Sequence, residues 1–462
     1  MLAKFKKKYI GDWDFYQKYL LLAIPMILQN AITNLVSFLD NIMVGQLGTE
    51  QMSGVAIVNQ LIFVYNLAIF GAVSAASIFG AQYFGKGNHK GHMYSFRFKL
   101  YATLLVTGGA ILLFLTKGSA LISLYLTDTV GNGATDLALQ YGLEYLAIMM
   151  VGLIPFAVNQ SYATNIKETG QTFIPMLASF VAVGTNAILD YLMIFGIGPF
   201  PELGVQGAAL ATVIARYIEA LIVVIWAHIH RGKNRYLEGA YTGFGIPLAE
   251  LKAILIKGFP LMMNEVLWAA GMTTVTQCYS VRGLDVVAGL NIASTITNLF
   301  NIVYLQLGSC ISIVVGQYLG AGKLEDAKDA DNKMIVFSVF CCVIMAALMF
   351  VVGGFFPGIY NTTEKIRELA TSFIAVSAII MPFCAFSHAS YFTLRSGGKT
   401  VVTFLFDSVF TWVIVVPAAY LLAHFTGLGI VSIYFLVQGT ELIKVIIGYL
   451  MVKSNVWVVQ MV

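Results

Sequence analysis

Long apolar stretches recur along the whole chain, and each is bounded by Gly, Pro, Asn or a cluster of charged residues. An α-helix needs about 20 predominantly apolar residues to cross a lipid bilayer. The pattern therefore predicts an all-α polytopic membrane protein with twelve transmembrane helices. The expected spans are 15–42, 54–80, 96–116, 137–163, 171–196, 206–229, 252–278, 286–315, 333–355, 367–392, 400–424 and 428–452.

The composition agrees with this interpretation. Of the 462 residues 58% are hydrophobic and only 11% are charged, whereas soluble proteins carry about 25% charged residues. This excludes a soluble enzyme, a secreted disulfide scaffold and a nucleic-acid-binding module, and the long unbroken stretches argue against an outer-membrane barrel. All five cysteines lie in apolar stretches of the second half, so we expect neither a disulfide framework nor a Cys/His metal site.

Lys and Arg are distributed unevenly among the connections between spans. The odd-numbered connections hold four of the 27, and the others lie in even-numbered connections, at the termini or within spans. Because short cytoplasmic loops are enriched in Lys and Arg, both termini are expected on the cytoplasmic side of the plasma (inner) membrane. The four exceptions are Lys117, Arg282, Lys365 and Arg367.

The two halves of the chain resemble each other. At an offset of 235 residues Pro25 meets Pro260, and residues 80–87 (GAQYFGKG) meet residues 315–322 (VGQYLGAG). An offset of 228 aligns the KETGQT and RSGGKT segments that follow the fourth and tenth spans. Shared Gly, Pro and polar positions at a constant offset indicate a duplication, and therefore two homologous six-helix bundles.

Six spans per half give both halves the same orientation in the membrane. Such parallel repeats are typical of carriers that alternate access to a central site. A duplication with a purely structural role is the other interpretation. The predicted domains are an amino-terminal lobe over 1–230, a cytoplasmic linker over 231–250 and a carboxy-terminal lobe over 251–462. Pro25 and Pro260, both within predicted helices, are expected to kink them.

Ionisable residues within membrane helices are rare and usually mark a pathway. Asp40 lies on the first predicted helix and Asp190 on the fifth, with Asn186 one turn before Asp190. Both helices run outward and the sixth starts outside, so Thr212 is expected at the same level. Such oxygen ligands suit Na⁺, and a close carboxylate pair suits a shared proton. The alternative is an inert polar network.

A second group of polar residues follows the two prolines. Glu265 and Asn264 come shortly after Pro260, near Met, Trp and Phe residues that would form an aromatic wall for a lipophilic cation. A buried, protonated structural Glu is the alternative. The candidates for contact with substrate or for coupling are Glu265, Asn264, Gln29, Asn30 and Asn34.

Other charged residues in the spans have simpler explanations. Arg216 and Glu219, and likewise Glu441 and Lys444, are spaced i, i+3, so we expect structural ion pairs within their helices. No Walker-type loop is present, and no nucleophile with a base suggests catalysis, so an ATPase activity and an enzyme are not expected.

Several segments of the chain resemble the multidrug and toxic compound extrusion (MATE) transporters, the NorM-like branch more than the DinF-like one. The resemblance extends over essentially the whole chain. Its most specific segments are Asp40–Gly45 (DNIMVG), Gly80–Gly85 (GAQYFG), Thr185–Asp190 (TNAILD), Gly204–Thr212 (GVQGAALAT) and Leu394–Gly398 (LRSGG).

The resemblance implies two six-helix lobes around a V-shaped central cavity and export driven by inward Na⁺ or H⁺ flow. It also implies that Glu265 matches the acidic residue on the seventh helix of NorM-like proteins. The amino-lobe cation site is matched by Asp40, Asn186, Asp190 and Thr212. One departure concerns the tenth helix, where Cys384 stands in place of an expected aspartate, with Ser387 and His388 as the nearest polar residues.

The predicted function is that of a secondary active antiporter that exports cationic or lipophilic compounds in exchange for Na⁺ or H⁺. We expect a monomer that needs no cofactor beyond the coupling ion, no ATPase subunit and no nucleic acid. The alternative is a flippase for a lipid-linked precursor. Such a protein would line its cavity with Arg or Lys, and here only Arg216 and Lys444 lie in mid-span.

Overall fold

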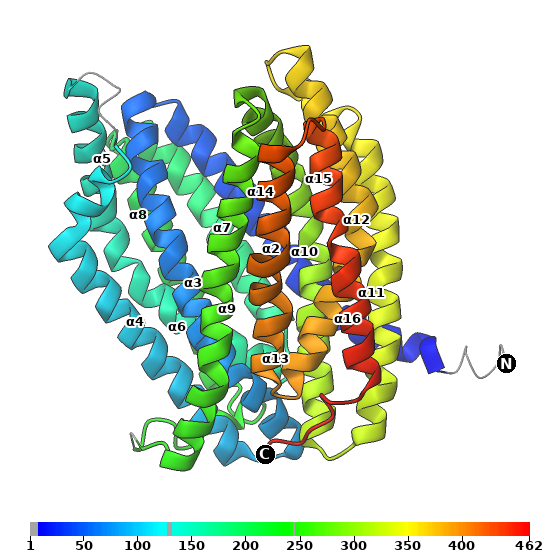
Figure 1. Cartoon of the computed structure of the whole chain (residues 1–462). Coiled ribbons are helices and arrows are strands. Elements are labelled where there is room, and N and C mark those ends of the chain that lie inside the picture. Colours follow the sequence, from blue (N-terminus) through cyan, green and yellow to red (C-terminus); the bar gives the residue numbers. More distant parts are fainter. Residues whose placement is uncertain (1–7, 127–131, 244) are drawn as a thin grey trace. The chain divides into compact units, whose positions relative to one another are not determined.

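The computed structural model describes residues 8–126, 132–243 and 245–462, and all the regular elements in these ranges are helical (Figure 1). Eleven helical segments in this part of the chain are long and apolar enough to cross a membrane, and a bent pair of helices supplies the twelfth. The prediction of an all-α polytopic membrane protein is confirmed.

The bounds of the spans agree with the predicted ones to within several residues, and most helices continue past the apolar stretch. In the first half the helices are α2 (Trp13–Gly45), α3 (Thr49–Lys86), α4 (His89–Ser123), α5 (Asn132–Val151), α6 (Leu153–Glu168), α7 (Phe173–Ile194) and α8 (Val205–Ile229), followed by the short 3₁₀ turn η1 (Arg235–Leu237).

The second half contains more breaks. Its elements are α9 (Leu248–Ser280), α10 (Leu284–Gly320), α11 (Leu324–Gly353), η2 (Phe356–Ile359), α12 (Glu364–Ser396), α13 (Thr400–Phe404), the π-helical turns η3 (Leu405–Val409) and η4 (Thr411–Val415), α14 (Val416–Phe425), α15 (Ile430–Gly439) and α16 (Glu441–Lys453).

The fourth predicted span is bent rather than straight. Helices α5 and α6 meet at 44° around Gly152. Pro155 lacks the N–H that would bond to the carbonyl of Val151, so the helix cannot continue without a break there. Pro25 and Pro260, by contrast, lie inside the continuous helices α2 and α9, and the kinks predicted at them stay predictions.

The chain packs as two compact units, which we call the amino-terminal and the carboxy-terminal unit. The amino-terminal unit consists of Ile24–Gly80 and His89–Leu251. The carboxy-terminal unit consists of Lys252–Val462 together with Ala81–Asn88 and the described residues up to Ala23. Two pieces of the first half therefore pack with the second, and α2 changes unit next to Pro25.

Aromatic side chains attach the start of α2 to the carboxy-terminal unit. The Tyr19 hydroxyl donates to the Leu307 carbonyl oxygen over 2.9 Å and lies 3.3 Å from the Ser338 hydroxyl. One turn earlier Tyr16 stacks on Phe337 with ring centroids 4.7 Å apart. These contacts explain why this part of the first helix belongs to the second unit.

The repeated glycine motif lies where the end of α3 crosses α10, within the carboxy-terminal unit. A Cβ at Gly85 would collide with the backbone of Gln317, and a Cβ at Gly320 would collide with the backbone of Gln82. Gln317 and Gly320 are the residues that the offset of 235 places opposite Gln82 and Gly85. The crossing is therefore reciprocal, and glycine is needed on both helices for backbone to approach backbone.

The carboxyl end of the chain packs against this crossing. The Gln82 side-chain amide donates to the Ser396 carbonyl oxygen over 2.9 Å, and its oxygen accepts from the Met461 N–H over 2.8 Å. Gln460 donates to the Gly320 carbonyl oxygen over 3.0 Å. The Trp457 side chain is only 1% exposed. The last residues therefore form part of the fold of this unit.

The segment between α8 and α9 packs against the amino-terminal unit in a similar way. The Tyr236 ring lies 5.0 Å from the His92 ring and 5.2 Å from the Phe96 ring, centroid to centroid. The Arg97 guanidinium donates to the carbonyl oxygens of Ala240 and Gly239 over 2.9 and 2.6 Å. The predicted cytoplasmic linker is thus tied to the helix ends that precede it.

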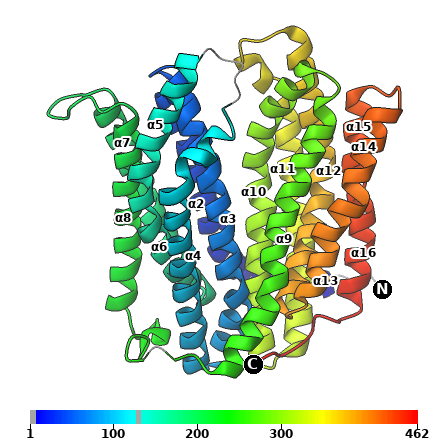
Figure 2. The same cartoon turned by 60° about the vertical axis from the view of Figure 1, so that its left-hand side comes forward.

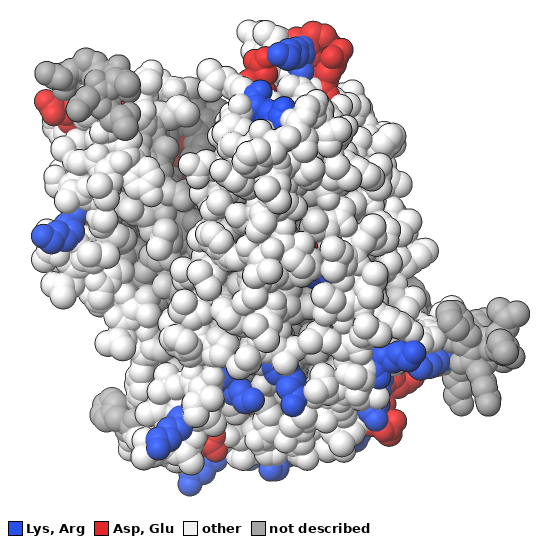
Figure 3. Space-filling view, viewed as in Figure 1, with Lys and Arg blue, Asp and Glu red and all other residues white. Residues whose placement is uncertain are grey.

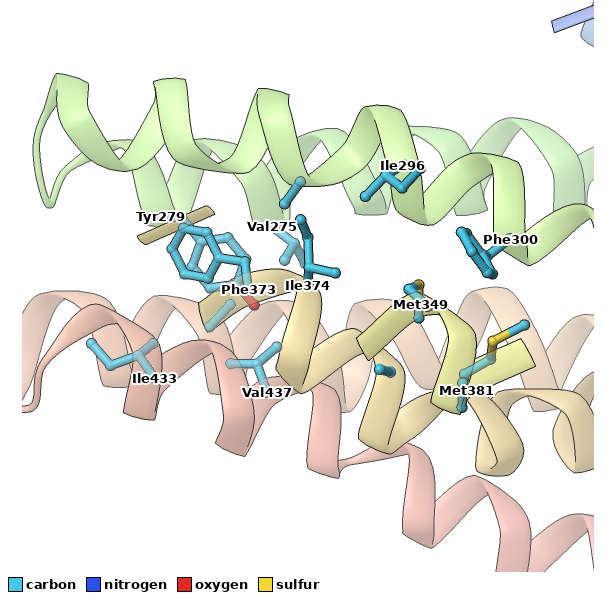
Figure 4. Packing of buried hydrophobic residues seen from close by; sticks show 14 of the residues in the cluster. Val275, Tyr279, Ile296, Phe300, Met349, Phe373, Ile374, Met381, Ile433 and Val437 are labelled. Atoms are coloured by element: carbon cyan, nitrogen blue, oxygen red, sulfur yellow. The ribbon is translucent and has the colours of Figure 1, made fainter. Parts of the chain in front are cut away.

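Each unit has its own buried apolar cluster. That of the carboxy-terminal unit joins α9, α10, α11, α12 and α15 (Figure 4), and both cartoon views place α10, α11 and α12 side by side (Figures 1 and 2). The face seen in Figure 3 is largely uncharged between its two ends. Many Leu, Ile and Phe side chains of the described residues are exposed. Contact with lipid explains an apolar surface of this extent.

Candidate functional site: an acid pair in the amino-terminal unit

The structure brings the predicted cation site together in the amino-terminal unit. Asp40 comes from α2, Asn186 and Asp190 come from α7, and Thr212 comes from α8. The charges of Asp40 and Asp190 are close enough to interact. The Asn186 amide donates to the Thr212 hydroxyl over 3.4 Å, which links α7 to α8 at the same level.

The carboxylates of this site lack donors. Asp190 has no exposed surface, and neither of its carboxylate oxygens has a hydrogen-bond partner among the described residues. Asp40 Oδ1 is also buried without a partner in the described structure. A buried carboxylate is very unfavourable unless it is neutralised or paired. The site therefore has the chemistry of a receptor for a cation or a proton, with oxygen ligands of the kind that Na⁺ accepts.

Tyr145 and Asn59 belong to the same site, and the sequence analysis missed them. Tyr145, on α5, is 1% exposed, and its charge interactions include both Asp40 and Asp190. Its hydroxyl donates to the Asn59 side-chain oxygen over 3.4 Å. A tyrosine and an asparagine in apolar helices give no distinct signal in one sequence; only the tertiary structure places them beside the acids.

The other polar residues of α2 have local partners. Asn30 donates to the Met26 carbonyl oxygen over 2.9 Å, and Asn34 donates to the Asn30 carbonyl oxygen over 3.0 Å. Gln29 differs, since its amide donates to the Ser179 hydroxyl on α7 over 2.7 Å. Gln29 therefore cross-links two helices, whereas Asn30 and Asn34 bond within their own helix.

The charges of the predicted pairs within α8 and α16 interact, but the partners form no direct salt bridge with each other among the described residues. Glu219 accepts a hydrogen bond from Ser179, while the Arg216 guanidinium lies 5.1 Å from the centroid of the Phe156 ring. Lys444 pairs with Asp407 of the π-helical turn η3, with 2.6 Å between Nζ and Oδ1. The i, i+3 spacing identified residues on one helix face, but buried charges found partners on neighbouring helices.

Asn264 and Glu265 lie beside the Lys444–Asp407 ion pair in the carboxy-terminal unit. Asn264 is 2% exposed and donates to Asp407 Oδ2 over 3.0 Å. Glu265 is half-buried, and its charge interacts with those of Arg395 and Asp407. Glu265 therefore has a basic neighbour from α12, which its own helix did not offer.

Ser387 and His388 lie near Cys384, and the charge of Glu441 interacts with that of His388. The His388 Nδ1 atom lies 3.0 Å from the Cys384 carbonyl oxygen, and the His388 ring lies 4.7 Å from the Tyr304 ring centroid. Ser387 is 1% exposed, and its hydroxyl has no hydrogen-bond partner among the described residues. No group of three or more His, Cys, Asp or Glu residues in the described ranges has metal-binding geometry.

The repeat locates the counterpart of the acid site in the second half. The offsets of 235 and 228 apply to the first five helices, and Gly204 and Gly429, the cap residues of α8 and α15, give 225 for the sixth. The counterparts are Val275 for Asp40, Phe373 for Tyr145, Ala418 for Asp190 and Val437 for Thr212. Val275, Phe373 and Val437 all belong to the buried apolar cluster of Figure 4. The two acids of the site therefore have apolar counterparts in the other half.

Comparison with known families identifies the group to which the chain is related. The MatE family profile matches residues 25–192 and again residues 260–421, so it recognises each half separately. The chain belongs to the MatE family. This confirms the resemblance drawn from the sequence motifs, and the second match agrees with the internal repeat.

Curated relatives of this MatE protein are similar over most of its length. A probable multidrug resistance protein NorM from Thermotoga maritima is 23% identical over 413 residues, covering 89% of this chain and 86% of the relative. A probable multidrug resistance protein NorM from Halalkalibacterium halodurans is 24% identical, covering 89% and 88%. These relatives support the NorM-like assignment within the family.

Solved structures support the same fold for this MatE chain. An outward-facing multidrug resistance MATE family transporter of the MOP superfamily superimposes with a TM-score of 0.85 at 20% identity, covering 96% of both chains. A MOP superfamily transporter from Pyrococcus furiosus gives the same TM-score, identity and coverage. The chain is thus a multi-pass membrane protein with the MATE transporter fold.

Proposed function

We propose that this chain is a secondary active antiporter that exports cationic or lipophilic compounds while Na⁺ or H⁺ flows inward at the acid site. The observation that carries the proposal is the acid pair of Asp40 and Asp190, in which Asp190 is buried and three of the four carboxylate oxygens are buried without a hydrogen-bond partner among the described residues. If a Lys or Arg side chain were paired with these two acids, the pair would serve as a structural element. Because the described residues show no such pairing, we expect the acids to bind a cation or a proton.

The proposed cycle depends on different affinities in two states. The coupling ion neutralises Asp40 and Asp190, while Asn186 and Thr212 supply neutral oxygens beside them. Asp40 stands on the part of α2 that belongs to the amino-terminal unit. Neutralising it changes the packing that α2 prefers, and the change weakens the hold on the exported compound. Only such differential binding can couple the two fluxes.

The compound is proposed to be an organic cation or a lipophilic molecule. The two NorM relatives are named as probable multidrug resistance proteins, which supports export of drugs. The candidates for contact with it or for coupling remain Glu265, Asn264, Gln29, Asn30 and Asn34. We further propose that the protein lies in the plasma membrane with both termini in the cytoplasm, as the distribution of Lys and Arg indicates, and that it acts as a monomer.

The test is ethidium efflux from proteoliposomes that contain the full chain, with Na⁺ and pH gradients imposed independently. We expect efflux under one of the gradients and its loss, to the level of empty vesicles, in Asp40→Asn. Asp329→Asn is the matched control, because Asp329 is an exposed carboxylate paired with Lys333 outside the site. Normal efflux by Asp40→Asn would overturn the mechanism.

Absence of efflux under both gradients, with wild-type protein present in the vesicles, would contradict drug export. It would favour the flippase for a lipid-linked precursor. The two basic residues in mid-span argue against that alternative, because both already have partners. Arg216 contacts the Phe156 ring, and Lys444 is paired with Asp407. Neither base is left to bind an anionic head group.

A further inference from the structure

Each half contains a junction at which three helices are joined by polar side chains. In the amino-terminal unit Gln29 donates to Ser179, and Ser179 donates to Glu219. In the carboxy-terminal unit Asn264 donates to Asp407 over 3.0 Å, and Lys444 donates to Asp407 over 2.6 Å. In both junctions an amide, a central acceptor and a charged group follow in the same order.

The two junctions are equivalent by position. The offset of 235 pairs Gln29 with Asn264, the offset of 228 pairs Ser179 with Asp407, and the offset of 225 pairs Glu219 with Lys444. These are the offsets already given by the prolines, by the segments after α6 and α12, and by the cap glycines. The duplication therefore kept the junction and reversed the sign of the charge at its third position.

The second junction holds its cation tightly. Both Asp407 oxygens are engaged, one by the Lys444 ammonium and one by the Asn264 amide. The ammonium also lies 5.5 Å from the Phe406 ring centroid and 5.9 Å from that of Phe410, distances at which a ring face attracts a cation. A carboxylate and aromatic faces are what a bound monovalent cation would meet, and Lys444 supplies that cation from its own chain.

The π-helical turn η3 adds to this arrangement. The Ser408 N–H donates to the Asn264 side-chain oxygen over 3.2 Å, and the Ser408 hydroxyl donates to the same oxygen over 2.7 Å. Both polar atoms of the Asn264 side chain are thereby hydrogen-bonded to residues of η3, Nδ2 to Asp407 and Oδ1 to Ser408. The junction is a satisfied neutral network, the condition under which a buried ion pair is tolerated.

Two other acids of the carboxy-terminal unit, both near this junction, have positive neighbours. The charge of Glu265 interacts with that of Arg395, and the charge of Glu441 interacts with that of Lys444. The positions equivalent to the acid pair are apolar, with Val275 at that of Asp40. This unit therefore supplies its own cations around Asp407. Asp331 on α11 is also buried in this unit, but it lies outside the junction, where Thr393 donates to its Oδ1 and its Oδ2 has no hydrogen-bond partner among the described residues.

From these contacts we infer that Lys444 acts as a tethered counter-cation, so that the external coupling ion binds at the Asp40–Asp190 site and not at Asp407. The inference rests on the proposed function and assigns to Asp407 and Lys444 a role that sets where the ion binds. Asn264 positions Asp407 for the ammonium.

The main test compares Lys444→Met with Asp407→Asn/Lys444→Met in proteoliposomes. Lys444→Met leaves the Asp407 carboxylate without its ammonium, so a second external cation is expected to take its place. Efflux should then rise more steeply with cation concentration, with a Hill slope that goes from about one toward two. The double variant removes both charges, and the slope should return to the wild-type value.

An unchanged slope in Lys444→Met, or a double variant that keeps the steep dependence, would overturn the inference. A second measurement covers the case in which these variants do not fold. Hydrogen exchange is recorded for full-length Asp40→Asn with and without Na⁺, and at two pH values. No cation-dependent change is expected in peptides from α9, η3 and α16, and protection there by Na⁺ or by acid would contradict the inference.

The two proposals fail in different ways. Wild-type protein that shows no gradient-driven efflux would defeat the proposed antiporter, whatever the hydrogen exchange shows. Cation-dependent protection around Asp407 in Asp40→Asn, with normal wild-type efflux, would leave the antiporter intact and defeat only the role of Lys444. Asp329→Asn again serves as the control for loss of a carboxylate outside both regions.

Discussion

In the amino-terminal unit Asp40 and Tyr145 face a cluster of oxygen atoms, whereas their counterparts Val275 and Phe373 in the carboxy-terminal unit are packed among Ile, Met and Val side chains (Figure 4). One duplicated frame thus holds a polar site at these positions in one half and an apolar cluster in the other. The difference teaches that the repeat preserved helix positions, because packing geometry constrains them, while the side chains at equivalent positions differ in polarity.

Substitutions in two segments, the carboxyl end of the chain and the connection between α8 and α9, should have the largest effect on stability. Trp457 and Tyr236 are each 1% exposed, so truncating either to alanine leaves a large cavity that costs about 3–5 kcal/mol. Melting temperatures in detergent would measure this, with Trp13→Ala as the control because Trp13 is 70% exposed. If Trp457→Ala had the same melting temperature as the control, the carboxyl end of the chain would contribute nothing to the stability of its unit.

Grafting the acid into the other half should be the next most harmful change. Val275→Asp places a carboxylate in the apolar cluster, where it costs about 2.5–3.5 kcal/mol on insertion scales. The reciprocal Asp40→Val should abolish ion-driven efflux without lowering the melting temperature, because it removes an unpartnered buried acid. Equal stability of Val275→Asp and wild type would show that the cluster accommodates an acid as readily as its counterpart does.

The glycine crossing is a feature that both halves share, and breaking it should have a smaller effect. In Gly320→Ala the new methyl group meets the backbone of Gln82, and such overpacking costs about 1–3 kcal/mol. Gly108→Ala is the control, since nothing lies near a Cβ at Gly108. The two variants would be compared by thermal melting, and equal melting temperatures would argue against the close approach.

Removing one hydroxyl group should have the smallest effect. Tyr145→Phe makes this position like its counterpart Phe373 and loses the bond to Asn59. A hydrogen bond of this kind contributes about 1 kcal/mol, so the cation concentration for half-maximal efflux should rise about fivefold. Phe373→Tyr is the matched control and should leave that concentration unchanged. A shift as large in the control would show that Tyr145 has no special place.

Much of the fold could be predicted from the sequence because its causes are local or periodic. Each apolar stretch is long enough to span a bilayer, and the segments GAQYFGKG and VGQYLGAG recur at one offset. The motif around Asp190 led to the acid site for the same reason, since an acid in an apolar helix stands out in any sequence. The bend at Gly152 was missed, because one glycine and a following proline do not interrupt the hydropathy.

The partners of buried charges could not be predicted in this way. Lys444 has an acid three residues away on its own helix, yet it pairs with Asp407, which lies 37 residues earlier in the chain. Spacing on one helix shows which side chains share a face, but it does not show what that face meets. For the same reason the sequence does not show that the start of α2 packs with the carboxy-terminal unit, where the Tyr19 hydroxyl donates to the Leu307 carbonyl oxygen.

The amino-acid sequence by itself thus determined the membrane-spanning helices, the duplication, the family and the acids that interrupt apolar segments, since all of these follow from composition and order along the chain. The tertiary structure alone decided which acid stays unpaired and which receives a lysine. That choice depends on side chains brought together across helices, where burial makes an unpaired charge unfavourable.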